Sequence, residues 1–208
     1  MTTGPSESAA AGLRYVALGD SYTIGTSVSA DERWPDQLVD RLEGGLVLTA
    51  NLGVNGYSSD DLIQLELPQL AALDPGFVTL AIGVNDVVRG VPESTYVANV
   101  GRILDELLTR LAPDRILVVA TPDYTVTPMG ASYGSPAQQS AAIARFNAIL
   151  LEAATDRGIA AVPEIFEISR AAATDASLTA ADGLHPSGSQ YGLWVDVIAP
   201  AVERLVAP

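Results

Sequence analysis

The chain has 208 residues, of which 48% are hydrophobic and none is cysteine, and its formal net charge is −14. This composition fits one globular domain with a buried core, and it excludes disulfides, thiolate metal sites and cysteine nucleophiles. A chain this acidic repels phosphate backbones and anionic membranes, so we expect no nucleic-acid partner, and no apolar run is long enough to predict a membrane span.

The first residues lack the basic start and the apolar core of an export signal. We therefore expect residues 1–12 to form a flexible tail, residues 13–208 to form a single domain, and the protein to be cytoplasmic. The sequence does not indicate an oligomeric state.

Five short and mostly continuous apolar runs predict strands that are buried on both faces. They are residues 14–18, 46–50, 77–82, 115–120 and 159–162. The stretches between and after them predict helices. These cover residues 34–42, 60–73, 93–111, 136–158 and 187–206. Alternation of strand and helix predicts an α/β fold, with a parallel sheet covered by helices on both faces.

Four short polar motifs lie next to these predicted elements. They are Gly19-Asp20-Ser21-Tyr22, residues 51–56, Gly83-Val84-Asn85-Asp86 and Asp182-Gly183-Leu184-His185. The first three follow the first three strands, and the fourth precedes the last helix. Binding sites in parallel sheets form beyond the carboxyl ends of the strands. Each motif alone is also ordinary turn or helix-cap chemistry, so the prediction of a site depends on their occurring together.

Together the motifs supply the groups that acyl transfer to a serine requires. The Ser21 hydroxyl is a weak nucleophile without a base, and His185 is the only histidine in the chain. Asp182, three residues earlier, can orient the imidazole. Asn85 and the main-chain amide of Gly56 can donate hydrogen bonds to an oxyanion.

The four motifs resemble the blocks of the SGNH hydrolases, also called the GDSL esterase/lipase family. The resemblance spans about residues 15–205, with Tyr22 at a position where leucine is frequent. It implies a three-layer α/β/α sandwich with a five-stranded parallel sheet of order 2-1-3-4-5, as in flavodoxin. It places the oxyanion glycine at Gly56, with Gly53 as the competing choice, beside Asn85 and the main-chain amide of Ser21.

The expected function is therefore hydrolysis of carboxylic esters with short or medium acyl chains, through an acyl-enzyme on Ser21 and without a metal or organic cofactor. A carbohydrate O-acetyl esterase and a non-catalytic ligand-binding domain are the alternatives. Asp20 and Asp86 are expected to be structural. Residues 121–135 form the longest predicted loop, in which Tyr124 and Tyr133 either bind substrate or only cover the core.

Overall fold

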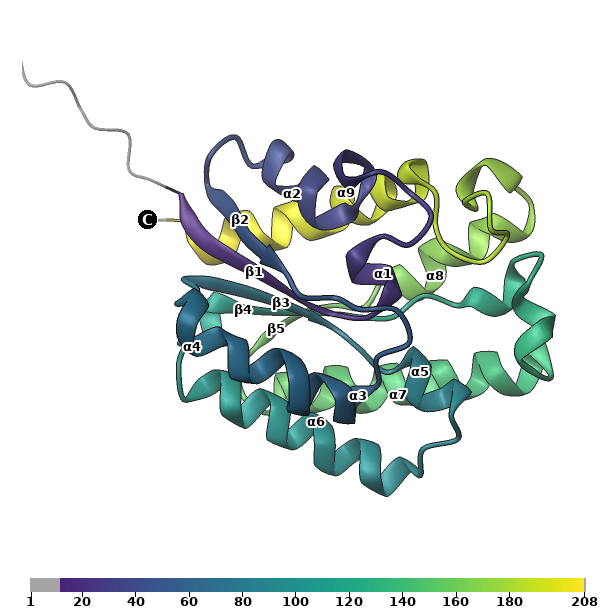
Figure 1. Ribbon diagram of the computed structural model, residues 1–208, viewed down its shortest axis with the longest axis horizontal. Coiled ribbons are helices and arrows are strands. Elements are labelled where there is room, and N and C mark those ends of the chain that lie inside the picture. The colour runs from purple at the N-terminus through teal and green to yellow at the C-terminus, as the bar shows by residue number, and fades with distance from the viewer. Residues whose placement is uncertain (1–11, 208) are drawn as a thin grey trace, which may run out of the picture.

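Five parallel strands form one sheet in the order β2-β1-β3-β4-β5, as Figure 1 shows for a computed structural model that describes residues 12–207. The strands are β1 (Leu13–Gly19), β2 (Leu46–Asn51), β3 (Phe77–Ala81), β4 (Ile116–Val119) and β5 (Ala160–Val162). The prediction of a parallel five-stranded sheet in this order is confirmed. The strands β3 and β4 are buried along their whole length, which is why their sequences are apolar except at Thr79, whose hydroxyl hydrogen-bonds to that of Tyr15 at 2.7 Å.

Helices cover both faces of the sheet, which confirms the three-layer architecture (Figure 1). One face carries α2 (Trp34–Arg41) and α9 (Gly188–Val206), which pack against each other, with α8 (Ile165–Ser169) beside them. The other face carries α3 (Ser59–Asp61), α4 (Leu70–Leu73), α5 (Val84–Val88), α6 (Glu93–Leu108) and α7 (Pro136–Thr155). The helix α1 (Ser21–Ile24) follows β1 directly.

The segment predicted as one helix over residues 60–73 is helical but irregular. Between α3 and α4 the chain widens, because the Leu67 N–H donates to the carbonyl of Leu62 five residues earlier. Pro68 follows, and it can donate no backbone hydrogen bond to a regular helix. The wide turn places Glu66 in the interior, where its side chain is fully buried.

Other boundaries differ by a few residues from those predicted. The third long helix ends at Leu108 rather than residue 111, and the short helices α5 and α8 were not predicted. The last helix begins where its sequence indicates, because the Ser187 hydroxyl accepts the Gln190 N–H as a cap. The predicted tail, residues 1–12, lies outside the described residues except for Gly12. Over residues 12–207, no helix is long and apolar enough to cross a membrane.

The order of the strands brings the first and third motifs together. β1 pairs with β3 in parallel, and Gly19 is the register partner of Ala81. Ser21 and Asn85 therefore leave adjacent strand ends on the same edge of the sheet. This edge is where a parallel sheet forms its sites.

Candidate active site

A cleft of about 300 Å³ lies beyond these strand ends. It is lined by residues from all four motifs, from the loop after β4 and from the end of α5. They are Ser21, Tyr22, Asn55, Gly56, Val84, Asn85, Val88, Tyr124, Tyr133, Leu184 and His185. Six of the seven candidate site residues therefore line one cleft, and the seventh, Asp182, contacts His185 from behind it.

The first motif presents Ser21 through a sharp turn between β1 and α1. Gly19 has a φ of +154°, and a Cβ there would lie 2.4 Å from the carbonyl oxygen of Ala81, so only glycine fits. Asp20 then caps α1, because its Oδ1 accepts the Tyr22 N–H at 3.0 Å. Ser21 is the first residue of α1, and its N–H donates to no group in the described part of the chain.

The second motif packs so tightly on α1 that one of its glycines has no room for a side chain. A Cβ on Gly53 would lie 2.7 Å from the backbone oxygen of Asp20 and 2.7 Å from the backbone nitrogen of Ile24. Gly53 does not line the cleft, whereas Gly56 does. The Gly56 N–H has no acceptor among residues 12–207. The geometry therefore favours Gly56 over Gly53 as an oxyanion donor.

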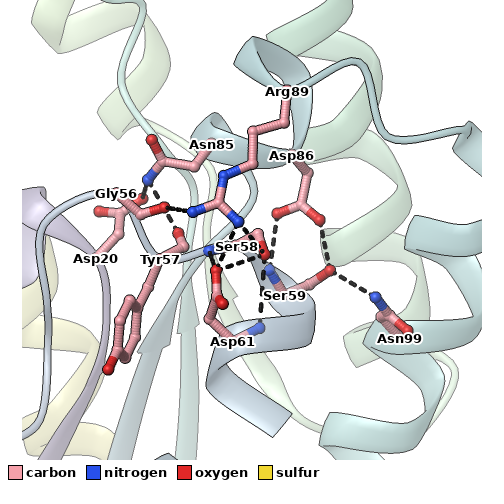
Figure 2. A network of polar contacts seen from close by, with 10 residues as sticks. All are labelled: Asp20, Gly56, Tyr57, Ser58, Ser59, Asp61, Asn85, Asp86, Arg89 and Asn99. Carbon is pink, nitrogen blue, oxygen red and sulfur yellow. Dashed lines mark hydrogen bonds and ion pairs between the residues drawn. The ribbon is translucent and has the colours of Figure 1, made fainter. Parts of the chain in front are cut away.

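Helix α5 clamps the loop that carries Gly56, as Figure 2 shows. Asn85 Nδ2 donates to the carbonyl of Tyr57 at 2.9 Å and, over a longer distance of 3.3 Å, to Asp20 Oδ2. Arg89 donates to the carbonyl of Gly56. Since both amide hydrogens of Asn85 have acceptors, a contact from Asn85 to an oxyanion would replace the longer bond to Asp20.

The same segment is tied to α3 through polar contacts, of which those of Asp86 are buried (Figure 2). Arg89 donates to Asp61 Oδ2 at 2.8 Å and to the Ser58 hydroxyl at 3.2 Å. Asp86 accepts the Ser59 N–H at 2.8 Å and the Ser59 hydroxyl at 2.5 Å. Burial raises the pKa of Asp86, although these hydrogen bonds oppose the rise. Asp86 therefore holds the loops in place, which agrees with the structural role predicted for it.

The fourth motif joins Asp182 to His185. Asp182 Oδ2 lies 2.6 Å from His185 Nδ1 and accepts the Ser27 hydroxyl at 2.7 Å. Its Oδ1 accepts the backbone N–H groups of Leu184 and His185 at 2.9 and 3.0 Å. Partial burial would raise the pKa of Asp182, but the hydrogen bonds from His185, Ser27 and the backbone outweigh it and hold the pKa well below its usual value. Asp182 is thus an anion in weak acid as well as at neutral pH.

The contact with Asp182 leaves Nε2 as the ring nitrogen of His185 that can reach a substrate or Ser21. Both residues line the cleft, and the Ser21 side chain is largely buried, with 6% of the residue exposed. Over residues 12–207, no hydrogen bond joins the Ser21 hydroxyl to His185. Bonds between a nucleophile and its base are often long until substrate is bound.

The loop after β4 supplies two aromatic walls of the cleft. It folds into the short helical turns Tyr124–Val126 and Gly130–Tyr133. Tyr124 is buried, and its hydroxyl donates to Gln139 Oε1 at 3.1 Å. Tyr133 is 42% exposed, and its ring packs edge-on against Tyr124 with 5.5 Å between ring centroids.

This loop is anchored at its start and touches the fourth motif. Asp123 accepts the N–H and hydroxyl of Thr125 at 3.1 and 2.6 Å, and the hydroxyl of Ser140 at 2.7 Å. Farther along, the Met129 N–H donates to the carbonyl of Gly183 at 2.9 Å. The loop and the fourth motif are thus joined through main-chain atoms.

Glu66 is a residue near the site that the sequence reasoning missed. Its Oε2 accepts the Gly19 N–H at 3.0 Å, directly before the first motif. Burial raises the pKa of Glu66 to about 9, against the effect of this hydrogen bond, and burial raises the pKa of Asp20 to about 7. The inward position depends on the wide helical turn, which no local pattern in residues 60–73 indicates.

Because Glu66 is buried in its protonated form, we expect the free energy of unfolding to depend on pH. Native Glu66 keeps its proton up to about pH 9, whereas the unfolded chain loses it near 4.5, so the free energy of unfolding falls as pH rises through this interval. Above about pH 7 Asp20 has already ionised in the native state. The slope that remains up to pH 9, about 1 kcal/mol per pH unit, then comes from Glu66.

Urea unfolding of Glu66→Gln at pH 7, 8 and 9 measures this effect, because glutamine mimics the neutral acid. We expect the variant to lose the slope that the wild type shows. The exposed residue Glu203 provides the control, and Glu203→Gln should keep the wild-type slope. Equal slopes in all three proteins would contradict a neutral Glu66.

The fold and the cleft define a three-layer α/β/α protein in which a serine, a glycine, an asparagine and a histidine meet at the carboxyl ends of parallel strands. The model of the GDSL-like lipase/acylhydrolase family matches residues 17–193. The chain belongs to this family, as its motifs predicted.

Similar proteins include an arylesterase from Vibrio mimicus, 30% identical over 104 residues that make up 48% of this chain and 50% of that protein. The chain thus spans about half the length of the curated relative it matches. Among solved structures, a lipase/acylhydrolase from Enterococcus faecalis has a TM-score of 0.71 at 19% identity, over 92% of this chain and 96% of that one. An acetyl xylan esterase from Geobacillus stearothermophilus has a TM-score of 0.68 at 19% identity, over 95% of each chain. At these identities the structural likeness concerns the fold.

Proposed function

We propose that the protein hydrolyses carboxylic esters with short or medium acyl chains, using Ser21 as the nucleophile. The observation that carries the proposal is the arrangement around one cleft. His185 faces it with Nδ1 held by Asp182 at 2.6 Å, and Ser21 lies in the same cleft beside two backbone N–H groups with no acceptor in the described part of the chain. A non-catalytic binding domain would have no use for a buried serine and an oriented imidazole in one cleft. The arylesterase relative supports the same activity.

Acylation follows from this arrangement. The Ser21 Oγ attacks the carbonyl carbon of the ester, and His185 Nε2 takes the hydroxyl proton. The carbonyl oxygen becomes an oxyanion, which the N–H groups of Ser21 and Gly56 and the amide of Asn85 stabilise. The tetrahedral intermediate then breaks its bond to the alcohol oxygen, which leaves with the proton from His185.

Deacylation repeats these steps with water. His185 takes a proton from a water molecule, the hydroxide attacks the acyl-enzyme, and the bond to Ser21 Oγ breaks as the proton returns to it. Asp182 stabilises the charged imidazole in both halves of the reaction, because it remains an anion.

The lining of the cleft favours acyl chains over sugars. Most of its side chains are aromatic or aliphatic, and its volume of about 300 Å³ suits a small ligand. The Geobacillus stearothermophilus acetyl xylan esterase has a similar fold, so acetylated sugars belong in the same assay.

The experiment is a comparison of p-nitrophenyl acetate, butyrate, octanoate and palmitate with acetylated xylan. We expect the largest kcat/KM for acetate, butyrate or octanoate. No turnover of any ester would support a binding domain instead. A preference for acetylated xylan over every nitrophenyl ester would support a carbohydrate esterase.

A second prediction concerns the tyrosines of the loop after β4, which we expect to affect the preference between long and short acyl chains. Tyr133→Ala removes an exposed ring from the cleft, so we expect the ratio of kcat/KM between octanoate and acetate to change by roughly five-fold, about 1 kcal/mol, without loss of stability. Tyr124 is buried, so Tyr124→Phe, which keeps the ring, is the appropriate partner variant.

Leu193→Ala is the control, because it also removes an exposed apolar side chain but does so on α9, away from the cleft lining. An unchanged ratio in Tyr133→Ala would mean that the ring only covers the core.

A further inference from the structure

We propose that Ser27 is a positioning residue that holds Asp182 in the orientation in which it serves His185; the proposal rests on the function proposed above. The Ser27 hydroxyl donates to Asp182 Oδ2 at 2.7 Å. The same oxygen lies 2.6 Å from His185 Nδ1, so the two donors share one acceptor atom.

Ser27 is the donor to Asp182 that comes from a distant part of the chain. In the described part of the chain, the other donors to Asp182 are the backbone of Leu184 and the backbone and ring of His185, all within three residues of the acid. Ser27 lies 155 residues away, in the loop that follows α1. Its hydroxyl therefore connects the segment that begins with Ser21 to the segment that holds the base.

The backbone of Ser27 is in a conformation that a serine rarely adopts. Its φ is +69°, in the left-handed region, which costs a residue with a Cβ about 1 kcal/mol. Two other non-glycine residues with positive φ, Glu43 and Asp74, lie within two residues of the ends of α2 and α4, where this conformation is common. Ser27 is instead the third residue of a turn that the Val28 N–H closes on the carbonyl of Gly25 at 3.3 Å, a position where a positive φ usually selects glycine or asparagine.

Glycine would adopt this conformation without strain, so what serine adds is its hydroxyl. Strain of this kind persists where the surrounding structure determines it, and it gathers at functional sites. Here the turn at residues 25–28 presents the hydroxyl of Ser27 to Asp182. We infer that the bond keeps Oδ2 aligned with His185 Nδ1, and that it fixes the separation of Ser21 from the imidazole.

The expected loss of rate on removing the Ser27 hydroxyl depends on how exposed Asp182 is to water. The side chain of Asp182 is 29% exposed, so water can replace part of the lost bond. A hydrogen bond to a partly solvated acceptor corresponds to roughly a three- to ten-fold change in rate.

The test uses two variants of Ser27 and one matched control. Ser27→Gly removes the hydroxyl and relieves the strain, whereas Ser27→Ala removes the hydroxyl and keeps the strain. Ser29→Ala is the control, because the Ser29 hydroxyl also donates to a carboxylate at 2.7 Å in the same loop, but to Glu32. We expect kcat for butyrate to fall roughly three- to ten-fold in both Ser27 variants, with KM and the rate of Ser29→Ala unchanged.

The Tm of the two variants distinguishes the loss of the Ser27 hydroxyl from the relief of the backbone strain. Both variants lose the hydrogen bond, but the Tm of Ser27→Gly should exceed that of Ser27→Ala, because glycine relieves the strain that alanine keeps. In an Asp182→Asn background, Ser27→Gly should cause no further loss, since Ser27 acts through the acid. A wild-type kcat in Ser27→Gly, or an additive loss in the double variant, would overturn the proposal.

A second readout does not depend on turnover. His185 is the only histidine, so every imidazole N–H signal in ¹H–¹⁵N NMR belongs to it, and the indole N–H signals of the two tryptophans differ from it in ¹⁵N shift. Ser27→Gly should shift the Nδ1 signal, because its acceptor loses the second donor, and Ser29→Ala should not. If Ser27→Gly leaves the spectrum unchanged, the positioning role is wrong. If the spectrum shifts but the wild type hydrolyses no ester, the proposed function is wrong and the contact itself stands.

Discussion

Ser21→Ala is expected to lower kcat for ester hydrolysis by roughly a thousand-fold or more, the usual effect of removing one member of such a triad. The fold should survive, because the Ser21 hydroxyl forms no hydrogen bond with another residue in the described range and its loss leaves no buried partner unpaired. Backbone donors at Ser21 and Gly56 remain in the variant, so some activity above the uncatalysed rate should persist.

Covalent labelling identifies the nucleophile directly. Treatment of the wild type with an organophosphate, followed by mass spectrometry, should give one adduct, on the peptide that contains Ser21. Ser189→Ala, at an exposed serine of α9, is the control and should keep both activity and labelling. An adduct on another serine, or an unlabelled wild type that still turns over, would remove Ser21 from this role.

Asn85→Ala is the second large effect, with an expected loss in kcat of roughly 10²- to 10³-fold and little change in KM. The complication is that Asn85 also clamps the loop through the carbonyl of Tyr57 at 2.9 Å. Loss of activity alone would therefore not separate an oxyanion donor from a loop clamp.

Arg89→Met distinguishes these two roles of Asn85. Arg89 holds the same loop through the adjacent carbonyl, that of Gly56 (Figure 2), but it does not line the cleft. Both variants should lower Tm. If Asn85 is an oxyanion donor, its variant should lose at least about ten times more kcat than Arg89→Met at a similar loss of stability. Equal losses would leave Asn85 as a structural residue of α5.

The sequence was most informative where one physical constraint decides the outcome. Strands buried on both faces are mostly apolar, so residues 77–82 and 115–120 predicted β3 and β4 to within a residue. The sheet order came from the resemblance of the motifs, and it agrees with the adjacency of β1 and β3 that brings Ser21 near Asn85.

The features that were missed depend on contacts between distant segments. No pattern in residues 60–73 indicates that Glu66 turns inward, because its partner is the Gly19 N–H, 47 residues away. Ser27 reads as an ordinary loop serine until its φ and its bond to Asp182 are known. The resemblance of the motifs already favoured Gly56 over Gly53, and the close approach of Gly53 to α1 adds a steric argument for the same choice.

The main-chain bond between Met129 and Gly183 has a consequence for changing selectivity by directed evolution. Since no side chain takes part in it, any residue except proline at position 129 can keep it. Tyr133 lines the cleft in the same loop, so position 133 can be randomised in a library while this main-chain bond keeps the loop joined to the segment of His185. Under the proposed function, such a library would change the ester preference while the four motifs, and with them the catalytic groups, stay unchanged.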